Sequence, residues 1–196
     1  MIENKVRCFG NGNAIYEKYH DNEWGYAEHN ENKLFEMLIL EGAQAGLNWL
    51  TILKKRQYYR DSFYNFDVNK VAAMTDSEMT QLLSNSNIIR NRAKIFSARS
   101  NAQAFQQIQQ QFGSFDNYIW QFVDYKTIYN HWQQSDQVPT QTNVSQAISQ
   151  DLKKRGMKFV GPVIIYSYMQ AIGMVNDHIK SCWRYEPSHL NCQHCN

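Results

Sequence analysis

Helical spacing of the apolar side chains is the feature that most restricts what this chain can fold into. Within 33–45, Leu34 and Leu38 are four positions apart, and so are Phe35 and Ile39, which places each pair on one face of a helix. No segment alternates convincingly between apolar and polar residues. Only 9 Gly and 3 Pro occur in 196 residues, fewer than the turns of a sandwich or barrel normally need. The sequence therefore predicts an all-α fold.

Local signals place the ends of the other helices. Thr75 and Glu78 form a capping box, Gly156 is a natural C-cap, and Pro162 suits a first helical turn. The predicted helices cover 33–45, 47–59, the stretch after Thr75, 91–110, 114–122, 145–155 and 162–172. No internal repeat and no linker rich in Gly, Ser or Pro divides the chain. We therefore expect a single two-lobed helical domain over 1–196.

Composition excludes several classes of protein. Hydrophobic residues make up 43% and charged residues 19%, a mixture typical of globular rather than disordered chains. Residues 1–5 contain no apolar segment of a secretory signal, and the most apolar run, 163–175, is too short to span a bilayer. Four Cys in such a chain do not indicate a disulfide framework. We expect a cytoplasmic monomer with reduced thiols and no membrane segment.

The net charge of +2 conceals an uneven distribution of charge. Residues 51–100 hold nine basic and four acidic side chains. A chain with local basic stretches and little net charge can bind a polyanion on one face. Solvated helix faces are the alternative interpretation, and charge alone favours it.

Cysteine and histidine residues near both ends of the chain suggest a metal site. Cys8 and His20 lie near the N-terminus, and His178 and Cys182 lie four residues apart near the C-terminus. On a helix, that spacing would place both on one face. Two thiolates and two imidazoles complete a closed tetrahedral zinc site, which would tie the two ends together. Buried thiols that bind no metal are the alternative.

A second group of cysteine and histidine residues could also form a zinc site. Cys192 and Cys195 form a C-x-x-C at the end of the chain, with His189 close by. With Cys182 they would form a zinc knuckle. We favour the simpler interpretation, a frayed tail with two incidental thiols.

Glu41 follows an apolar run, 34–40, and precedes Gly42. The apolar surroundings suggest at least partial burial, which is costly for a carboxylate without a partner. Ionisable groups in that situation are often functional. The equal alternative is that Glu41 faces solvent on a polar stripe.

Aromatic residues gather near these polar groups. Tyr16, Tyr19 and Trp24 surround His20 in the sequence, and Trp49 follows Glu41 by eight residues. Rings grouped with a carboxylate can clamp a planar, electron-poor ligand between their faces. For any single ring, ordinary core packing is the stronger interpretation.

The segment 153–162 has the sequence Lys-Lys-Arg-Gly-Met-Lys-Phe-Val-Gly-Pro between two predicted helices. A short turn with Gly at both ends exposes backbone N–H groups, and the second helix presents its positive N-terminus to a phosphate. Lysines nearby would add countercharge. A plain interhelical turn is the alternative.

The order of these features is more specific than any one of them. The motifs run from Cys8 to Cys182 as Tyr19 to Gly25, Leu34 to Met37, Leu40 to Gly42, Gln44 to Leu47, Trp49, Ile88 to Arg92, Lys153 to Gly156, Lys158 to Gly161 and Val175 to His178. In this order the chain resembles the bacterial 3-methyladenine DNA glycosylase I family. The resemblance covers nearly the whole chain, and the tail from about residue 187 lies outside it.

The resemblance implies a helix-hairpin-helix fold, about 145–173, with one structural zinc. The zinc ligands fall on Cys8, His20, His178 and Cys182. The hairpin falls on 157–161, with Lys158 and Gly161 as DNA-binding residues. The Gly-Leu pair that fills the gap left by a flipped base falls on Gly46 and Leu47.

The resemblance also assigns the base pocket. Glu41 is its catalytic carboxylate, and Tyr19 and Trp49 bind the base. Outer candidates for the same pocket are Tyr16, Trp24 and Ser167. One departure from the family pattern is Gly10, where members often have Trp; the neighbouring Phe9 is expected to fill that space.

The implied activity is hydrolysis of the N-glycosidic bond of 3-methyladenine in alkylated double-stranded DNA. Free 3-methyladenine is the product, and no strand cleavage is expected. Two alternatives belong to other classes. A non-catalytic helix-hairpin-helix module would bind DNA without a carboxylate and rings in a pocket, and a zinc hydrolase would need an open metal position.

Overall fold

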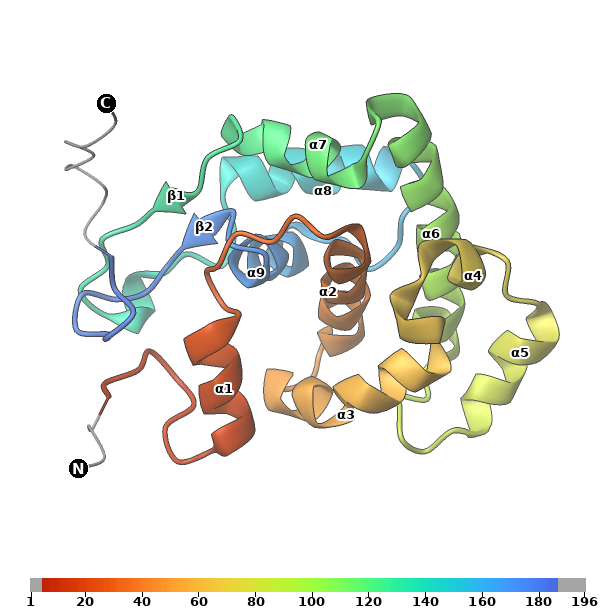
Figure 1. The fold of residues 1–196 in the computed structure, drawn as a ribbon, viewed down its shortest axis with the longest axis horizontal. Coiled ribbons are helices and arrows are strands. Elements are labelled where there is room, and N and C mark those ends of the chain that lie inside the picture. The colour runs from red at the N-terminus through yellow and green to blue at the C-terminus, as the bar shows by residue number, and fades with distance from the viewer. Residues whose placement is uncertain (1–4, 187–196) are drawn as a thin grey trace.

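The computed structural model describes residues 5–186 and is mostly helical (Figure 1). Its α-helices are α1 (Ala14–Asn22), α2 (Glu31–Gln44), α3 (Trp49–Ser62), α4 (Val68–Ala72), α5 (Asp76–Gln81), α6 (Arg92–Phe112), α7 (Phe115–Trp120), α8 (Asn143–Lys154) and α9 (Pro162–Ala171). Short 3₁₀ turns are η1 (Tyr64–Phe66), η2 (Leu82–Ser84), η3 (Gln121–Val123) and η4 (Ser135–Gln137). The helical fold predicted from the apolar spacing is confirmed.

Helix α2 forms the centre of the molecule (Figure 1). It packs against α3, α6, α7 and α9, and ten successive residues, Leu34 to Ala43, are buried. Two of them, Glu36 and Glu41, carry carboxyl groups. Because every side of this part of α2 faces protein, both carboxyl groups are held inside the fold, where each needs a partner or a function.

The predicted helix ends are close to the observed ones. Asn91 caps α6 through its side chain, and the capping box of Thr75 and Glu78 is present at α5. Helix α8 ends just before Gly156, whose φ of +88° suits glycine. Pro162 lies in the first turn of α9. These signals are local, so the sequence contains all the information that they need.

Four elements differ from the sequence expectation. Helices α1 and α4, both short, were not predicted. Two-residue strands, β1 (Ile128–Tyr129) and β2 (Val175–Asn176), form a parallel pair, although no strand was expected. Two residues are too few to show an alternating pattern, and their pairing depends on segments far apart in the sequence.

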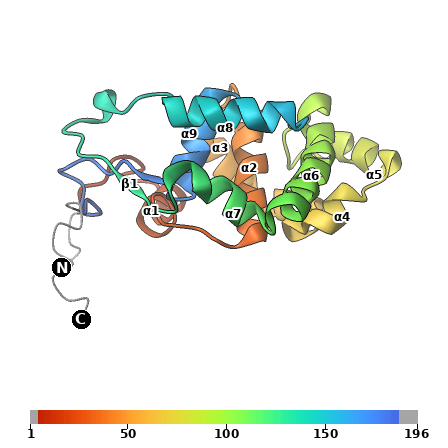
Figure 2. The same cartoon turned by 90° about the horizontal axis from the view of Figure 1, so that it is seen from above.

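The two described ends of the chain meet beside β2. The backbone N–H of Trp183 donates to the oxygen of Val6 at 2.9 Å. Figures 1 and 2 show both ends on the same side of the molecule, next to α1 and away from α4 and α5. This closure brings the N-terminal and C-terminal Cys and His residues together.

Within 5–186, no helix has both the length and the apolar character that crossing a bilayer requires.

Candidate active site and metal centre

Cys8, His20, His178 and Cys182 meet where the chain ends close. Their four ligand atoms all lie within 4.8 Å of one another. Cys182 Sγ is 3.4 Å from His20 Nε2 and 3.5 Å from His178 Nδ1, and Cys8 Sγ is 3.6 Å from His178 Nδ1. Both histidines are fully buried. The grouping expected from the sequence therefore exists in space.

These separations match a tetrahedral zinc site. Zn–S bonds of about 2.3 Å and Zn–N bonds of about 2.0 Å at tetrahedral angles place sulfur and nitrogen about 3.5 Å apart. The three sulfur–nitrogen distances given above bracket that value. The donor set of two thiols and two imidazoles is also the set that zinc prefers in closed structural sites.

The outer nitrogens of the two histidines are held by other groups. His20 Nδ1 lies 2.8 Å from Asp21 Oδ1, and His178 Nε2 lies 3.2 Å from the backbone oxygen of Trp24. Arg7 in turn forms two hydrogen bonds of 2.8 Å to Asp21 and lowers the pKa of that carboxyl. Such outer contacts fix the orientation of the imidazole ring that faces a metal.

The two thiols of the cluster differ in acidity. Hydrogen bonding to Cys8, and then to His178 and His20, lowers the pKa of Cys182 to about 2. The same bond to Cys182 raises the pKa of Cys8. The cluster therefore favours a thiolate at Cys182, and metal binding would require both thiols to lose their protons.

A turn, not a helix, brings the two C-terminal ligands of the cluster together. Residues 178–182 are not helical; they follow β2 in an irregular segment with a turn in which Cys182 N–H donates to the oxygen of Ile179 at 2.8 Å. The turn, rather than a helical face, brings His178 and Cys182 to one point. The alternative pair of Cys192 and Cys195 lies outside the described residues.

A pocket of about 240 Å³ opens next to this cluster. It is lined by Phe9, Tyr16, Tyr19, Trp24, Glu41, Gln44, Trp49, Ser167 and Gln170. All six residues that the sequence assigned to the base pocket are among them. The lining residues come from the segments before and after α1, from α1 itself, and from α2, α3 and α9.

Glu41 is buried in this pocket without a polar partner. Its side chain is 4% exposed, so the alternative that it faces solvent on a polar stripe is wrong. It forms no hydrogen bond or ion pair with any residue of 5–186. Burial raises the pKa of Glu41 to about 8. Burial also raises the pKa values of Tyr16 and Tyr19, so both neighbouring phenols are neutral.

Aromatic rings form the walls around this carboxyl group. The ring centroids of Tyr19 and Trp49 are 5.5 Å apart, and those of Phe9 and Trp24 are 4.9 Å apart in an edge-to-face arrangement. Phe9 thus lies in the pocket wall, as expected from the departure at Gly10. The backbone there has a φ of +89°, and a Cβ on Gly10 would lie 3.1 Å from the Tyr16 backbone, so a side chain at position 10 does not fit this conformation.

Gln44 and Gln170 are pocket residues that the sequence analysis missed. The Nε2 of Gln170 donates to Asp177 Oδ2 at 2.7 Å, which directs the amide oxygen away from Asp177. That oxygen has no partner among residues 5–186 and is not enclosed by protein. Helical spacing could have identified both residues, because each follows a predicted pocket residue by three positions.

The two expected DNA-binding turns lie at the surface. Gly46 has a φ of +76°, and Leu47 is 38% exposed. The Nε2 of Gln44 donates to the oxygen of Leu47 at 2.6 Å, which links the turn to the pocket. In the α8–α9 turn, Lys158 is exposed and Gly161 is the N-cap of α9 without a side-chain cap. The N–H groups at the start of α9 thus lack a capping side chain and suit an anion.

Comparison with known proteins gives the family. The family model for methyladenine glycosylase matches residues 9–185. The chain is 47% identical to DNA-3-methyladenine glycosylase 1 of Escherichia coli (strain K12) over 171 residues, which cover 87% of this chain and 91% of that protein. It is 45% identical to DNA-3-methyladenine glycosylase of Haemophilus influenzae over 169 residues, covering 86% and 91%.

Solved structures give the same result. A crystal structure of 3-methyladenine DNA glycosylase I matches with a TM-score of 0.90 and 47% identity over 92% of this chain and 100% of that one. A structure of the Staphylococcus aureus enzyme, described as the basis of 3-methyladenine recognition, matches with a TM-score of 0.89 and 36% identity, covering 92% and 96%.

A helical fold that encloses a carboxyl group among aromatic rings, with matches at this level, defines a glycosylase. The chain belongs to the methyladenine glycosylase family.

Proposed function

We propose that this protein removes 3-methyladenine from alkylated double-stranded DNA by hydrolysing the N-glycosidic bond, without cleaving the strand. The relatives that it resembles over most of its length are named for this activity. The observation that carries the proposal is Glu41, a buried carboxyl group without a partner in a pocket walled by aromatic rings.

The chemistry of the substrate explains this pocket. A base alkylated at N3 is cationic and is already a good leaving group, so it needs less acid catalysis than a neutral base. The enzyme must extrude the nucleotide from the helix, which costs a few kcal/mol and less for a damaged base. Stacking on Trp49 would return ~1–3 kcal/mol, and water attacks the oxocarbenium-like sugar.

Glu41 would distinguish the damaged base from normal adenine. A cation in the pocket favours the carboxylate form, which accepts a hydrogen bond from the edge of the base. Normal adenine has no charge, so the buried carboxyl group stays neutral beside it and this attraction is lost. The raised pKa of Glu41, about 8, means that the carboxyl group is largely neutral at neutral pH until such a cation enters.

The surface turns would hold the DNA around the extruded nucleotide. Leu47, on the turn that Gly46 allows, would fill the gap left in the base stack. The α8–α9 turn would act as the helix-hairpin-helix element, with the N–H groups at Gly161 and the charge of Lys158 on phosphates. The exposed basic side chains in 51–100, those of Lys54, Lys70, Arg90 and Arg92, would add to this attraction.

Zinc is the metal that the Cys8, His20, His178 and Cys182 cluster fits. With four protein ligands, no coordination position remains for water or substrate. The metal would therefore join the two ends of the chain beside the pocket and take no part in the hydrolysis.

Water, rather than an amine of the enzyme, is the expected nucleophile. No lysine lines the pocket among the residues that the structure describes, so no amine is placed to form a Schiff base with the sugar. Borohydride is therefore expected to trap no covalent adduct between the protein and DNA.

Chromatography of the bases released from methylated duplex DNA tests the proposal. The purified protein should release 3-methyladenine and leave 7-methylguanine in place, because the relatives that it resembles are named for 3-methyladenine. Glu41→Gln should lower kcat/KM by about 100-fold, which corresponds to ~2.7 kcal/mol, while the protein stays folded. Absence of base release by the folded wild-type protein would refute the activity and leave a DNA-binding module. Full activity of Glu41→Gln would refute the role of Glu41.

A further inference from the structure

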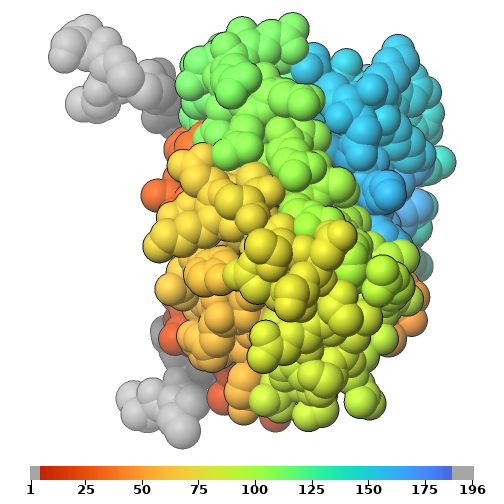
Figure 3. All heavy atoms as spheres, turned by 90° about the vertical axis from the view of Figure 1, so that its right-hand side faces the viewer, coloured from red at the N-terminus to blue at the C-terminus, as the bar shows by residue number. Residues whose placement is uncertain are grey.

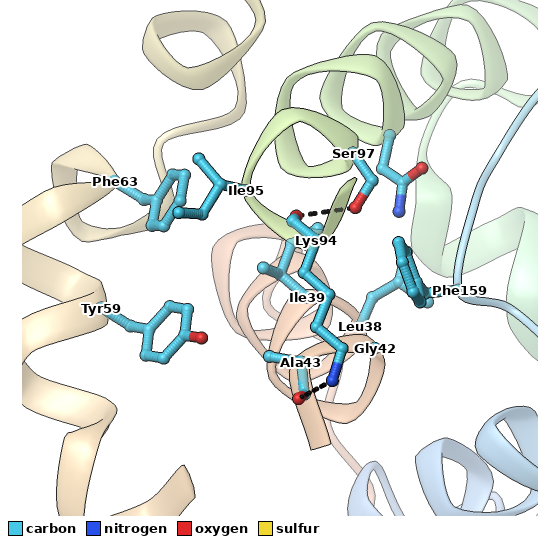
Figure 4. A pocket seen from close by; sticks show the side chains of 11 residues that line it. Leu38, Ile39, Gly42, Ala43, Tyr59, Phe63, Lys94, Ile95, Ser97 and Phe159 are labelled. Carbon is cyan, nitrogen blue, oxygen red and sulfur yellow. Dashed lines mark hydrogen bonds between the residues drawn. The ribbon is translucent and has the colours of Figure 1, made fainter. Parts of the chain in front are cut away.

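The ammonium group of Lys94 closes the carboxyl end of α2. Its Nζ donates to the backbone oxygens of Ala43 at 2.8 Å and of Ala45 at 2.6 Å. Figure 4 shows the Lys94 side chain extending toward Ala43 at the end of α2. Carbonyl groups at a helix end lack partners within the helix, and a cation there is favourable. Lys94 therefore fixes the path of the chain just before Gly46 and Leu47.

Asn101 binds the α8–α9 turn in a comparable way. Its Nδ2 donates to the oxygen of Lys158 at 2.9 Å, and its Oδ1 accepts from the Lys158 N–H at 2.8 Å. Asn101 is 3% exposed, so these bonds do not compete with water. One side-chain amide thus holds both backbone groups of Lys158, while the charged end of Lys158 stays at the surface.

Both residues that make these hydrogen bonds lie on the same side of α6. Lys94 and Asn101 are seven residues apart, two helical turns, and this spacing separates them by about 10 Å along one face. Phe159 packs against Gly42, where a Cβ would lie 3.1 Å from the Phe159 Cβ; the two residues face each other in Figure 4. Figure 3 shows the surface of α6 bordering that of the α8–α9 segment. The end of α2, the α8–α9 turn and α6 thus form one packed unit.

We propose that Lys94 and Asn101 are positioning residues that hold the Gly46–Leu47 turn and the α8–α9 turn in fixed relation. When the α8–α9 turn binds the backbone phosphates, Leu47 is then already placed to enter the base stack. A turn that is already held in its binding conformation loses less conformational entropy when DNA binds. Residues that pack against a site without touching the ligand commonly hold it in that conformation. The inference rests on the proposed function, because it assigns DNA to both turns.

Lys94→Met tests this role, because it keeps the apolar stem and removes the donors. On methylated duplex DNA, kcat/KM should fall about tenfold or more, as misplaced groups near a reacting centre commonly cost. Lys55→Met is the matched control. Lys55 also joins two backbone oxygens, those of Ser86 and Asn87, both at 3.1 Å, but holds neither DNA-binding turn. Its kcat/KM should stay within twofold of the wild type.

A double-mutant cycle separates positioning from a general structural role. If Lys94 acts through Leu47, Lys94→Met should change kcat/KM by less than twofold in a Leu47→Ala background. A full tenfold loss in that background would overturn the proposal. Unaltered excision by Lys94→Met, beside an active wild type, would also overturn it and leave the proposed function intact. An inactive wild type would instead reject the proposed function.

Salt dependence separates positioning from direct contact with DNA. A lysine bound to phosphate contributes about one unit to the slope of log K against log salt concentration. Lys94→Met should therefore bind DNA with the wild-type slope. A slope reduced by about one, with an unreduced slope for Lys55→Met, would show that Lys94 contacts phosphate and would overturn the proposal.

Discussion

Two glutamates on α2, five residues apart, have the same burial and opposite surroundings. Glu36 and Glu41 are both 4% exposed. Glu36 accepts hydrogen bonds from Arg56 and Arg60; burial raises its pKa, but these partners outweigh burial and lower it. Glu41 has no such partner, and burial raises its pKa to about 8.

The difference separates a buried charge that serves the fold from one that serves a ligand. A buried ion pair compensates the loss of water that each charge suffers. An unpaired carboxyl group destabilises its protein and is retained only where something else gains from it. The same contrast holds between the Cys and His cluster, where each polar atom has a partner, and the pocket beside it.

Loss of a ligand of the Cys and His cluster should have the largest effect. It should lower the stability of the protein much more than its catalytic activity. Cys182→Ser removes one of four ligands from a site that would join the two ends of the chain. We expect a loss of roughly 3 kcal/mol or more, a fall in Tm of about 6–12 °C. Below that Tm, kcat/KM should change less than threefold, because no step passes through the metal.

Metal analysis and differential scanning calorimetry test this expectation. The wild type should hold one zinc per chain, and the variant should lose it readily to a chelator. Zinc retained by Cys182→Ser at wild-type affinity would show that the ligand set is wrong and would point to the tail pair, Cys192 and Cys195.

Substitution of the two α2 glutamates should change stability in opposite directions. In the folded state the pKa of Glu41 is raised, so between about pH 4.5 and 8 the unfolded chain loses a proton that the folded chain keeps. Stability therefore falls as pH rises through this window. Glu41→Gln lacks this loss and should be more stable than the wild type above pH 8. The difference is a few kcal/mol at most, because a change of one pKa unit corresponds to ~1.4 kcal/mol.

Glu36→Gln is the matched control for that experiment. The lowered pKa of Glu36 means that its stabilisation is present above the unfolded-state pKa and is lost as pH falls through the folded-state value. Glu36→Gln should therefore be destabilised at neutral pH, by about 3 kcal/mol, since Arg60 loses its carboxylate partner and Arg56 keeps only Glu23. Urea unfolding from pH 4 to 9 measures both. If the free energies of unfolding of both variants fall together at high pH, the distinction between the two carboxyl groups is contradicted.

The sequence predicted the parts of this site that depend on local spacing or on an ordered set of motifs. Glu41 and the rings lie in one pocket as expected, and the ends of α6, α8 and α9 follow from caps and breakers near them in the chain. The spacing of His178 and Cys182 could not distinguish a helix from the turn observed over 178–182, because a four-residue spacing fits both conformations.

Contacts between distant segments could not be predicted in this way. The pairing of β1 with β2 joins residues 128 and 175, and the bond from Lys94 to Ala43 spans 51 positions. Neither segment has a local pattern that identifies its partner. The absence of a partner at Glu41 is also a property of the whole fold, since it depends on what every neighbouring element does not contribute.

The smallest expected effect concerns Gln170, a polar residue that lines the same pocket as Glu41. Asp177, 1% exposed, accepts a hydrogen bond from Gln170 Nε2. The amide oxygen of Gln170 is therefore the atom that remains available to a ligand. The remaining oxygen can only accept, and the exocyclic amine of an adenine is a donor.

Gln170→Met keeps the length of the side chain and removes this acceptor. One neutral hydrogen bond is worth about 1 kcal/mol, so the affinity for free 3-methyladenine, measured by quenching of tryptophan fluorescence, should fall about fivefold. Tm should fall by only a few degrees, because Asp177 loses one donor and keeps Asn130, Trp132 and Tyr166. Wild-type affinity in this variant would mean that the base is held by Glu41 and the rings alone, and that the order imposed by Asp177 belongs to the fold, like that of Glu36.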